Sequence, residues 1–203
     1  MLNLDERCVG IGVNTLLILK DRNKATFLKH KRTPGATMEA IDTEHVVPAG
    51  TFQPRREMPP VPDPDFNIYK TILRELGEEL LGRKEMEEVG SSTEDITRER
   101  HTKKFHQLFA DGYAKAFFLG WGLDPLTTKA EFLTAIVLDI HEFRRRFGEP
   151  RFKHNWEGRH EAFPFEEATV RDFVEGYNTL PAGAGCAKLA WDNRERLLGS
   201  VKA

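Results

Sequence analysis

The sequence has few cysteines, no long apolar run and no large excess of charge of one sign. Its two cysteines, Cys8 and Cys186, suggest no disulfide framework, so a reducing cytoplasm is predicted. Neither has a local histidine or a CxxC spacing that would indicate a nucleophile or a metal site. Both thiols are expected to be buried as small apolar groups. No window approaches the roughly 18 apolar residues that cross a bilayer. The N-terminal MLNLDERCVG lacks the basic and apolar segments of a secretory signal.

The charge is nearly balanced, with 30 lysines and arginines against 32 aspartates and glutamates in 203 residues. Binding to duplex nucleic acid depends on many contacts between cationic side chains and phosphates, so this balance argues against a nucleic-acid partner. One basic run, FRRRFG at 143–148, is the exception. A solvated helix end is the favoured interpretation of this run, and a nucleic-acid patch is the alternative.

The pattern of apolar segments predicts a mixed sheet between layers of helices, and therefore an α/β fold in one domain. The run Val9–Leu19 predicts a strand buried on both faces, and ATFLKHKR predicts the strand that returns beside it. Further predicted strands are EHVVPAG ending at Gly50, AKAFFLGWGL, EFLTAIVLDIHEF and the start of RHEAFPFEEATVRDFVEGY, which continues through a turn into a helix. The charged segment 83–105 is expected to be a helix tail and an exposed loop.

Five prolines between residues 54 and 64 predict an extended segment, because proline has no N–H and restricts the residue before it. This Pro-rich insertion, at about 51–64, is either a stiff connector or a lid over a ligand. Near the end of the domain 1–203, the Gly-rich break PAGAG precedes a helical extension at about 184–199. Side chains that would dock this extension on its own sheet, or on a partner such as a second copy in a homodimer, are Leu189, Trp191, Leu197 and Leu198.

The segment TILRELGEELLG (71–82) predicts an amphipathic helix that Asp63 or Asp65 can cap. Residues at helical spacing form an apolar stripe, as expected for a face packed in the core. The stripe comprises Tyr69, Ile72, Leu73, Leu76 and Leu80.

Three glutamates, Glu75, Glu78 and Glu79, lie on another arc of this helix, where spacings of three and four bring side chains together. Exposed like-charge pairs cost about 0.2–0.5 kcal/mol each, and the macrodipole disfavours anions near a helix C-terminus. Solvent and Arg83 can offset terms of this size, so a solvated acidic face is one interpretation. The other is a divalent cation, Mg²⁺ or Mn²⁺, bound by the clustered carboxylates.

The segment RELGEELLG resembles the second half of the Nudix box, Gly-x5-Glu-x7-Arg-Glu-U-x-Glu-Glu-x-Gly-U, in which U is a bulky aliphatic residue. Five residues match in order: Arg74, Glu75, Leu76, Glu78 and Glu79. Gly50 resembles the glycine that opens the box after a strand, and WEGRHEAFPFEEATV resembles the family's late strand and the turn into its C-terminal helix. The likeness covers about residues 9–180 and implies the α/β/α sandwich of the Nudix superfamily.

The box departs from the family pattern at its loop and at the end of its helix. The segment between Gly50 and Arg74 is longer than in the pattern, so the Pro-rich stretch is an insertion within the box. Phe66 stands where the family has a glutamate, and Leu81 stands where it has a glycine. These changes spare the carboxylate cluster and leave the substrate open.

The resemblance implies a metal-dependent hydrolase that cleaves the diphosphate linkage of a nucleoside diphosphate derivative. It assigns Glu75, Glu78 and Glu79 to Mg²⁺ or Mn²⁺, and it makes Glu79, Glu78 and Arg74 the catalytic group, with Arg74 orienting a box glutamate through a salt bridge. An ordinary surface pair between Arg74 and Glu78 is the alternative. The altered box also allows a nucleotide-sensing or regulatory domain that binds without hydrolysis.

The general base and the substrate-binding residues are not assigned, and each candidate also has an ordinary structural or surface role as its alternative. Candidates for the base outside the box are Glu157 and Glu161. Histidines near elements that rim the expected site are His45, His154 and His160. Aromatic side chains that could stack on a nucleobase are Phe52 and Trp156.

Overall fold

The computed structural model describes residues 10–32, 42–54, 66–81, 96–98, 102–125, 128–149 and 158–202. Most of the Pro-rich stretch lies outside these ranges, as do several residues considered above, namely Cys8, Asp63, Asp65, Arg83, His154, Trp156 and Glu157. Within these ranges, none of the helices has both the length and the apolar character needed to span a bilayer.

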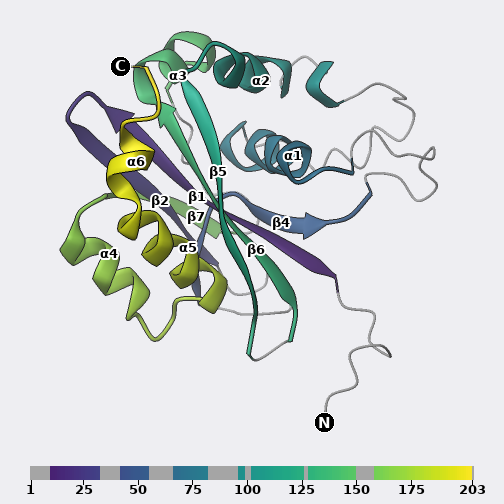
Figure 1. Cartoon of the computed structure of the whole chain (residues 1–203), viewed down its shortest axis with the longest axis vertical. Helices are drawn as coiled ribbons and strands as arrows, with labels where there is room; N and C mark the ends of the chain where they lie inside the picture. Colours follow the sequence, from purple (N-terminus) through teal and green to yellow (C-terminus); the bar gives the residue numbers. More distant parts are fainter. Residues whose placement is uncertain are drawn as a thin grey trace.

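One mixed sheet runs through the described structure, and helices cover both of its faces (Figure 1). The predicted α/β/α sandwich is therefore confirmed. β1 pairs with β6 in parallel, whereas the other pairings between strands are antiparallel. The strands are β1 (Ile11–Asp21), β2 (Lys24–Arg32), β3 (Glu44–Val46), β4 (Ala49–Phe52), β5 (Ala114–Leu123), β6 (Ala130–Asp139) and β7 (Gly158–Pro164).

The hairpin of β1 and β2 opens into a fork, and the segment 44–52 fills the space between its arms. Near the turn the two strands pair with each other, but farther along β1 pairs with β4 while β2 pairs with β3 and β7. In the fork, the N–H groups of Thr15 and Leu17 donate to the carbonyl oxygens of Pro48 and Val47, at 2.9 and 3.2 Å. The link between β3 and β4 therefore continues the hydrogen bonding along β1.

Helices α1 to α3 pack on one face of the sheet, and helices α4 to α6 pack on the other (Figure 1). β1 contributes side chains to the hydrophobic cores on both faces of the sheet, because alternate side chains point to opposite faces. Leu17 and Leu19 belong to the first core, and Leu16 and Ile18 belong to the second, which confirms a strand buried on both faces. The helices are α1 (Ile68–Leu81), α2 (Thr102–Ala110), α3 (Ile140–Phe147), α4 (Glu167–Val174), α5 (Pro181–Asp192) and α6 (Arg194–Leu198), and Ile96–Arg98 form a 3₁₀ turn.

The predicted stripe of α1 is confirmed, because the side chains of Ile72, Leu73, Leu76 and Leu80 are buried and Tyr69 packs partly against them. The helix begins at a cap that the sequence analysis did not name. The Asn67 Oδ1 atom accepts the N–H groups of Tyr69 and Lys70, at 2.9 and 3.4 Å, which satisfies two donors that have no partner inside the helix.

Two predicted boundaries are wrong. The segment IHEF was read as the end of a strand, but β6 ends at Asp139, whose Oδ1 atom accepts the Glu142 N–H at 2.7 Å and caps α3. PAGAG was read as a break, but it forms the first turns of α5, with Pro181 at the helix start. Glycine is needed there because a Cβ at Gly183 would lie 2.7 Å from His45 Nδ1, so only a bare backbone lets α5 approach the sheet.

Helix α2 lies partly in the segment that was expected to be an exposed loop. Phe105 and Leu108 are fully buried there, but a helix of nine residues with few buried positions gives too short a pattern to predict. The basic run lies at the end of α3. Its arginines form ion pairs with Glu149, Glu142 and Asp111, as a solvated helix end would.

The C-terminal helices dock on the sheet of their own chain. Leu197 is fully buried, and Trp191 and Leu198 pack against the same core. The Trp191 ring meets Phe165 edge-on, with centroids 5.4 Å apart. Cys186 is also fully buried, as predicted for a small apolar group. These contacts favour a structural role for the extension over a role in binding a partner.

Candidate active site

Glu79 reaches from the C-terminal part of α1 to the fork in the sheet. Its Oε1 atom accepts the backbone N–H of Ala49 at 3.0 Å. The residue is only 8% exposed, and its Oε2 atom has no hydrogen-bond partner among the described residues. A buried carboxylate oxygen without a partner is costly, so this atom is placed where a cation or a donor from a ligand would stabilise it.

Glu75 and Arg74 occupy the same side of α1, next to the start of β4. One guanidinium nitrogen of Arg74, Nη2, lies 2.9 Å from Glu75 Oε1 and 3.2 Å from the carbonyl oxygen of Thr51. Gly50 lies directly under the Glu75 carboxylate, because a Cβ there would be 2.2 Å from Oε1. Arg74 therefore forms an ion pair with Glu75 and a hydrogen bond to the start of β4, and its role in orienting a glutamate for catalysis stays a prediction.

Burial raises the pKa of Glu75 to about 8. The Arg74 guanidinium acts against this shift, whereas the negative charges of Glu78 and Glu79 add to it. The three predicted carboxylates are therefore close enough to repel one another in a poorly solvated place. With the side chain of Glu75 only 13% exposed and Glu79 buried, the acidic arc is not a solvated face.

Two histidines join Glu79 on this side of the sheet. His30 of β2 and His160 of β7 are directly opposite in the antiparallel register, and their rings meet at 82° with centroids 4.9 Å apart. His160 Nε2 lies 3.5 Å from Glu79 Oε2. All three residues are buried, and each offers a ligand atom within 4.8 Å of the others, so the group could hold a metal ion.

Sequence reasoning considered His160 only as a rim residue and did not consider His30. The strand ATFLKHKR did carry a signal for His30. This residue alternates with lysines and lies two residues after the buried Leu28, so the two side chains share one face of the strand. No local pattern pairs His30 with His160, since their meeting depends on two strands that are distant in the sequence.

The other described candidates lie elsewhere. Glu161 follows His160 on β7, so strand alternation turns it toward the opposite face of the sheet, away from Glu79. His45 of β3 is buried, and its Nε2 atom donates to Asn14 Oδ1 at 2.8 Å, which is a structural hydrogen bond.

The imidazole of His45 should contribute a loss of stability in mild acid, opposite in sign to the contribution of Glu75, whose pKa is raised. Burial lowers the pKa of this imidazole to about 3, and the charges of Arg32, His30 and Lys129 act in the same direction. Between about pH 6.5 and pH 3, His45 therefore binds a proton in the unfolded chain but not in the folded chain, so its contribution to stability falls as the pH falls. From pH 7 to pH 5 this contributes roughly 2 kcal/mol.

Urea denaturation at both pH values measures this effect, with His45→Gln as the comparison. Glutamine can donate the same hydrogen bond to Asn14 but does not titrate. From pH 7 to pH 5 the free energy of unfolding of the wild-type chain should change less favourably than that of the variant, by roughly 2 kcal/mol. Equal changes in the two proteins would contradict the role given to His45.

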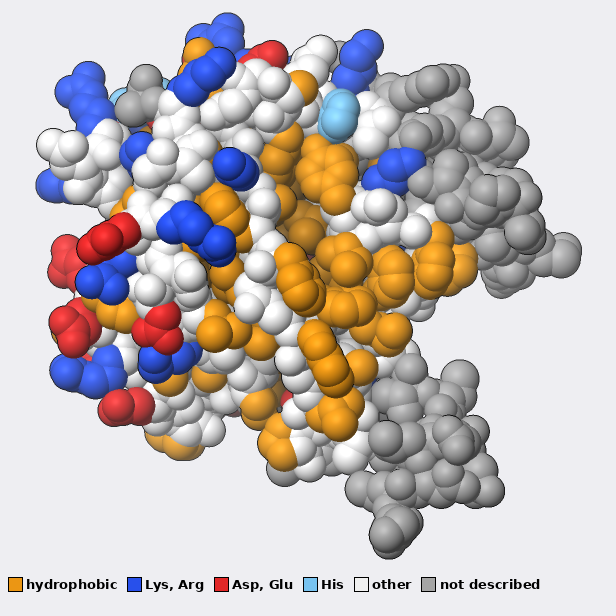
Figure 2. Space-filling model, in the orientation of Figure 1, with side chains coloured by type: hydrophobic (Ala, Val, Ile, Leu, Met, Phe, Trp, Pro, Cys, Tyr) orange, Lys and Arg blue, Asp and Glu red, His pale blue; other side chains and the backbone are white. Residues whose placement is uncertain are grey.

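Aromatic side chains continue the surface beyond Gly50 and Thr51. Phe52 of β4 stacks on Phe66 just before α1, with ring centroids 4.3 Å apart and planes 16° apart. Figure 2 shows hydrophobic side chains gathered over the edge strand β5, where Phe118 and Trp121 are 57% and 67% exposed. Because Phe66 stacks on Phe52, one face of the Phe52 ring is already in contact with another aromatic ring.

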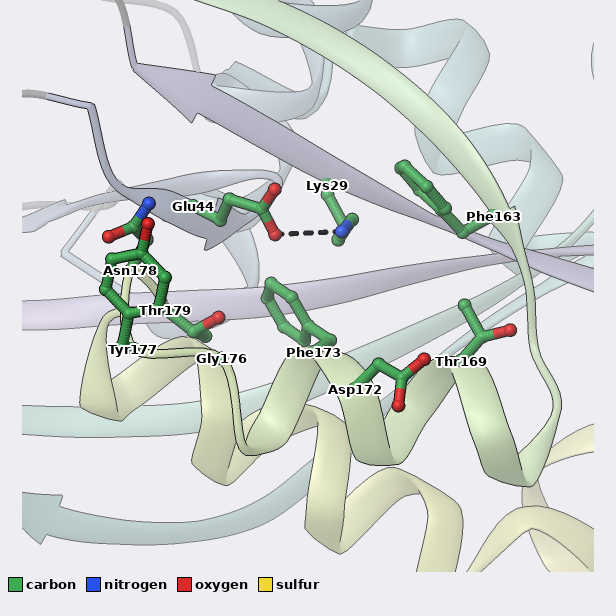
Figure 3. Close-up of a pocket in the computed structure, with 10 residues that line it drawn as sticks. All are labelled: Lys29, Glu44, Phe163, Thr169, Asp172, Phe173, Gly176, Tyr177, Asn178 and Thr179. Carbon is green, nitrogen blue, oxygen red and sulfur yellow. Dashed lines mark hydrogen bonds and ion pairs between the residues drawn. The ribbon is translucent and has the colours of Figure 1, made fainter.

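A cavity of about 400 Å³ lies on the other side of the sheet, between β2, β7 and α4 (Figure 3). Lys29 and Glu44 form an ion pair of 2.8 Å at its wall, and Lys29 Nζ lies 3.9 Å from the centre of the Phe163 ring. Because Lys29 and His30 alternate on β2, the sheet separates this cavity from Glu79. None of the three box glutamates lines it.

The structure resembles two solved Nudix proteins over nearly its whole length. The NUDIX domain of Shewanella oneidensis NrtR, solved in complex with ADP ribose, aligns with a TM-score of 0.51 and 11% identity, covering 95% of this chain and 91% of that chain. A NUDIX hydrolase from Alicyclobacillus acidocaldarius aligns with a TM-score of 0.53 and 15% identity, covering 97% and 98%. No family model and no curated protein matches the sequence. Identities this low establish the fold alone.

Proposed function

Because the chain has a Nudix-like fold, we propose that it is a metal-dependent hydrolase of a nucleoside diphosphate derivative. The observation that carries the proposal is the position of Glu79. Its carboxylate is buried against Ala49 at the fork in the sheet, with one oxygen that has no hydrogen-bond partner among the described residues and two further glutamates beside it. The general base is not assigned.

Glu75, Glu78 and Glu79 are proposed to hold the cation. Their mutual repulsion, which contributes to the raised pKa of Glu75, would be relieved by a positive charge among them. A divalent cation supplies neutralisation of the diphosphate charge and acidifies water for attack on phosphorus. Arg74 is proposed as a positioning residue, because its bonds to Glu75 and to the Thr51 carbonyl fix α1 against β4.

The substrate class follows from the fold and from the carboxylate chemistry. The NrtR domain was solved with ADP ribose, which contains a diphosphate between two groups. A carboxylate-bound divalent cation can neutralise such a diphosphate, and the specificity for the two attached groups would come from other surfaces.

A substrate screen tests this proposal. The purified chain is incubated with a panel of nucleoside diphosphate derivatives, with Mg²⁺, with Mn²⁺ and with a chelator, and the products are separated by chromatography. We expect cleavage of at least one compound at the diphosphate, and only with a metal. Absence of any product across the panel would contradict a hydrolase of this class.

A second candidate is a domain that binds such a nucleotide without cleaving it. Phe66, which stands where the family has a glutamate, stacks on Phe52 and brings an apolar ring instead of a carboxylate. Loss of one acidic group would weaken catalysis more than binding. Calorimetry that detects nucleotide binding without metal, combined with an intact nucleotide after long incubation, would favour this candidate.

A further inference from the structure

Two histidines and one glutamate converge on a single buried point beside α1. Antiparallel residues that are directly opposite project to the same face of a sheet, so the pairing of His30 with His160 directs both rings toward α1. Glu79 comes from the helix above them, and the ligand atoms of the three residues lie within 4.8 Å of one another.

This group contains polar atoms that the described residues do not satisfy. Glu79 Oε2 and both ring nitrogens of His160 have no hydrogen-bond partner in the described ranges, although His160 is only 3% exposed. Nearly all buried side-chain polar atoms in proteins have a partner, and each that lacks one is costly. One bound cation would satisfy the carboxylate oxygen and an imidazole nitrogen together.

The spacing suits a metal with short bonds to nitrogen and oxygen. Two ligands, each about 2.1 Å from a tetrahedral zinc ion, lie roughly 3.4 Å apart. The distance of 3.5 Å between His160 Nε2 and Glu79 Oε2 already agrees with this value. This distance is too long for a strong charged hydrogen bond between the two side chains. The arrangement suits a shared metal ion better than direct contact.

We infer that His30, Glu79 and His160 bind one transition-metal dication, of the class of Zn²⁺ or Fe²⁺. Imidazole nitrogen favours these ions, whereas Mg²⁺ prefers oxygen ligands. Three protein ligands leave at least one position open to a ligand from solution. Glu79 is also one of the ligands of the cation in the proposed function, but this inference does not require that the chain hydrolyses a diphosphate.

Metal uptake by the full chain tests the site directly. The protein is stripped with a chelator, dialysed against equal concentrations of Zn²⁺ and Mg²⁺, and analysed for both elements. We expect about one zinc per chain, and Co²⁺ in its place should give visible absorption bands that Zn²⁺ abolishes. Failure to take up stoichiometric zinc would overturn the inference.

Variants identify the ligands. His30→Ala and His160→Ala should each weaken zinc binding by more than about 100-fold, since losing an outer partner of a metal ligand alone costs about 10–100-fold. His141→Ala is the matched control, because this exposed histidine pairs with Asp21 at 2.8 Å, away from the site. Unchanged affinity in both folded cluster variants would overturn the assignment.

X-ray absorption of the zinc-loaded wild-type chain covers the case in which the variants do not fold. Two imidazoles at about 2.0–2.1 Å are expected, and a shell of oxygen ligands alone would contradict the site. Zinc binding without turnover would count against the proposed hydrolase only. Turnover with Mg²⁺ in a chain that takes up no zinc would count against this inference only.

Discussion

Replacing Glu79 with glutamine should abolish turnover while the chain stays folded. The Oε1 atom of glutamine can still accept the Ala49 N–H, which Glu79 accepts at 3.0 Å. The second oxygen becomes an NH₂ group, which cannot bind a cation. Because the loss of an outer partner of a metal ligand costs about 10–100-fold, the loss of the ligand itself should cost at least about 100-fold in kcat/KM.

Steady-state kinetics on a compound found in the screen measures this loss, and thermal unfolding checks the fold. In the absence of metal the variant should be at least as stable as the wild type, because one of the charges that repel Glu75 is gone. Glu195→Gln is the matched control, since this exposed residue on α6 loses the same charge far from α1. Full activity of the Glu79 variant would end its assignment to the catalytic group.

Replacing Gly50 with alanine should both destabilise the chain and impair catalysis. The new Cβ would lie 2.2 Å from Oε1 and 2.3 Å from Cδ of Glu75, so the carboxylate must leave its place beside Arg74. Overpacking of this kind costs about 1–3 kcal/mol. A displacement of about 1 Å at a catalytic group can cost on the order of 100-fold in rate.

Urea denaturation and the same kinetic assay measure the two effects. Gly122→Ala is the control, because a Cβ at that position on β5 meets nothing within 4 Å. Adding Glu75→Ala to Gly50→Ala removes the obstructing carboxylate. The double variant should therefore lose less stability than the sum of the two single losses. A fully additive result would show that Gly50 and Glu75 are not in contact.

The sequence predicted the elements whose patterns are strong and local. The burial of β1 on both faces and the apolar stripe of α1 follow from the chemistry of neighbouring residues, and both are confirmed. α5 was predicted to begin too late, because a glycine-rich start is normally a poor helix former. Its close approach to His45 outweighs that preference, and such an approach is a tertiary effect.

The candidate site was predictable only in its helical part. The spacing of the three glutamates suggested a cluster, and their mutual effect on the pKa of Glu75 agrees with proximity. The Glu75 partner of Arg74 and the convergence of His30 and His160 depend on pairings between distant strands. Whether these carboxylates bind a metal stays a prediction until uptake is measured.

The fork in the central sheet makes the site sensitive to chain length at one place. Only Val47 and Pro48 separate β3, which is paired with β2, from β4, which is paired with β1. A single inserted residue there would exchange the two faces of one strand relative to the other, because side chains alternate along a strand. Gly50 would then no longer face Glu75 on α1, while His30 kept its place. Laboratory libraries that aim to alter specificity should therefore vary side chains in this link and leave its length constant.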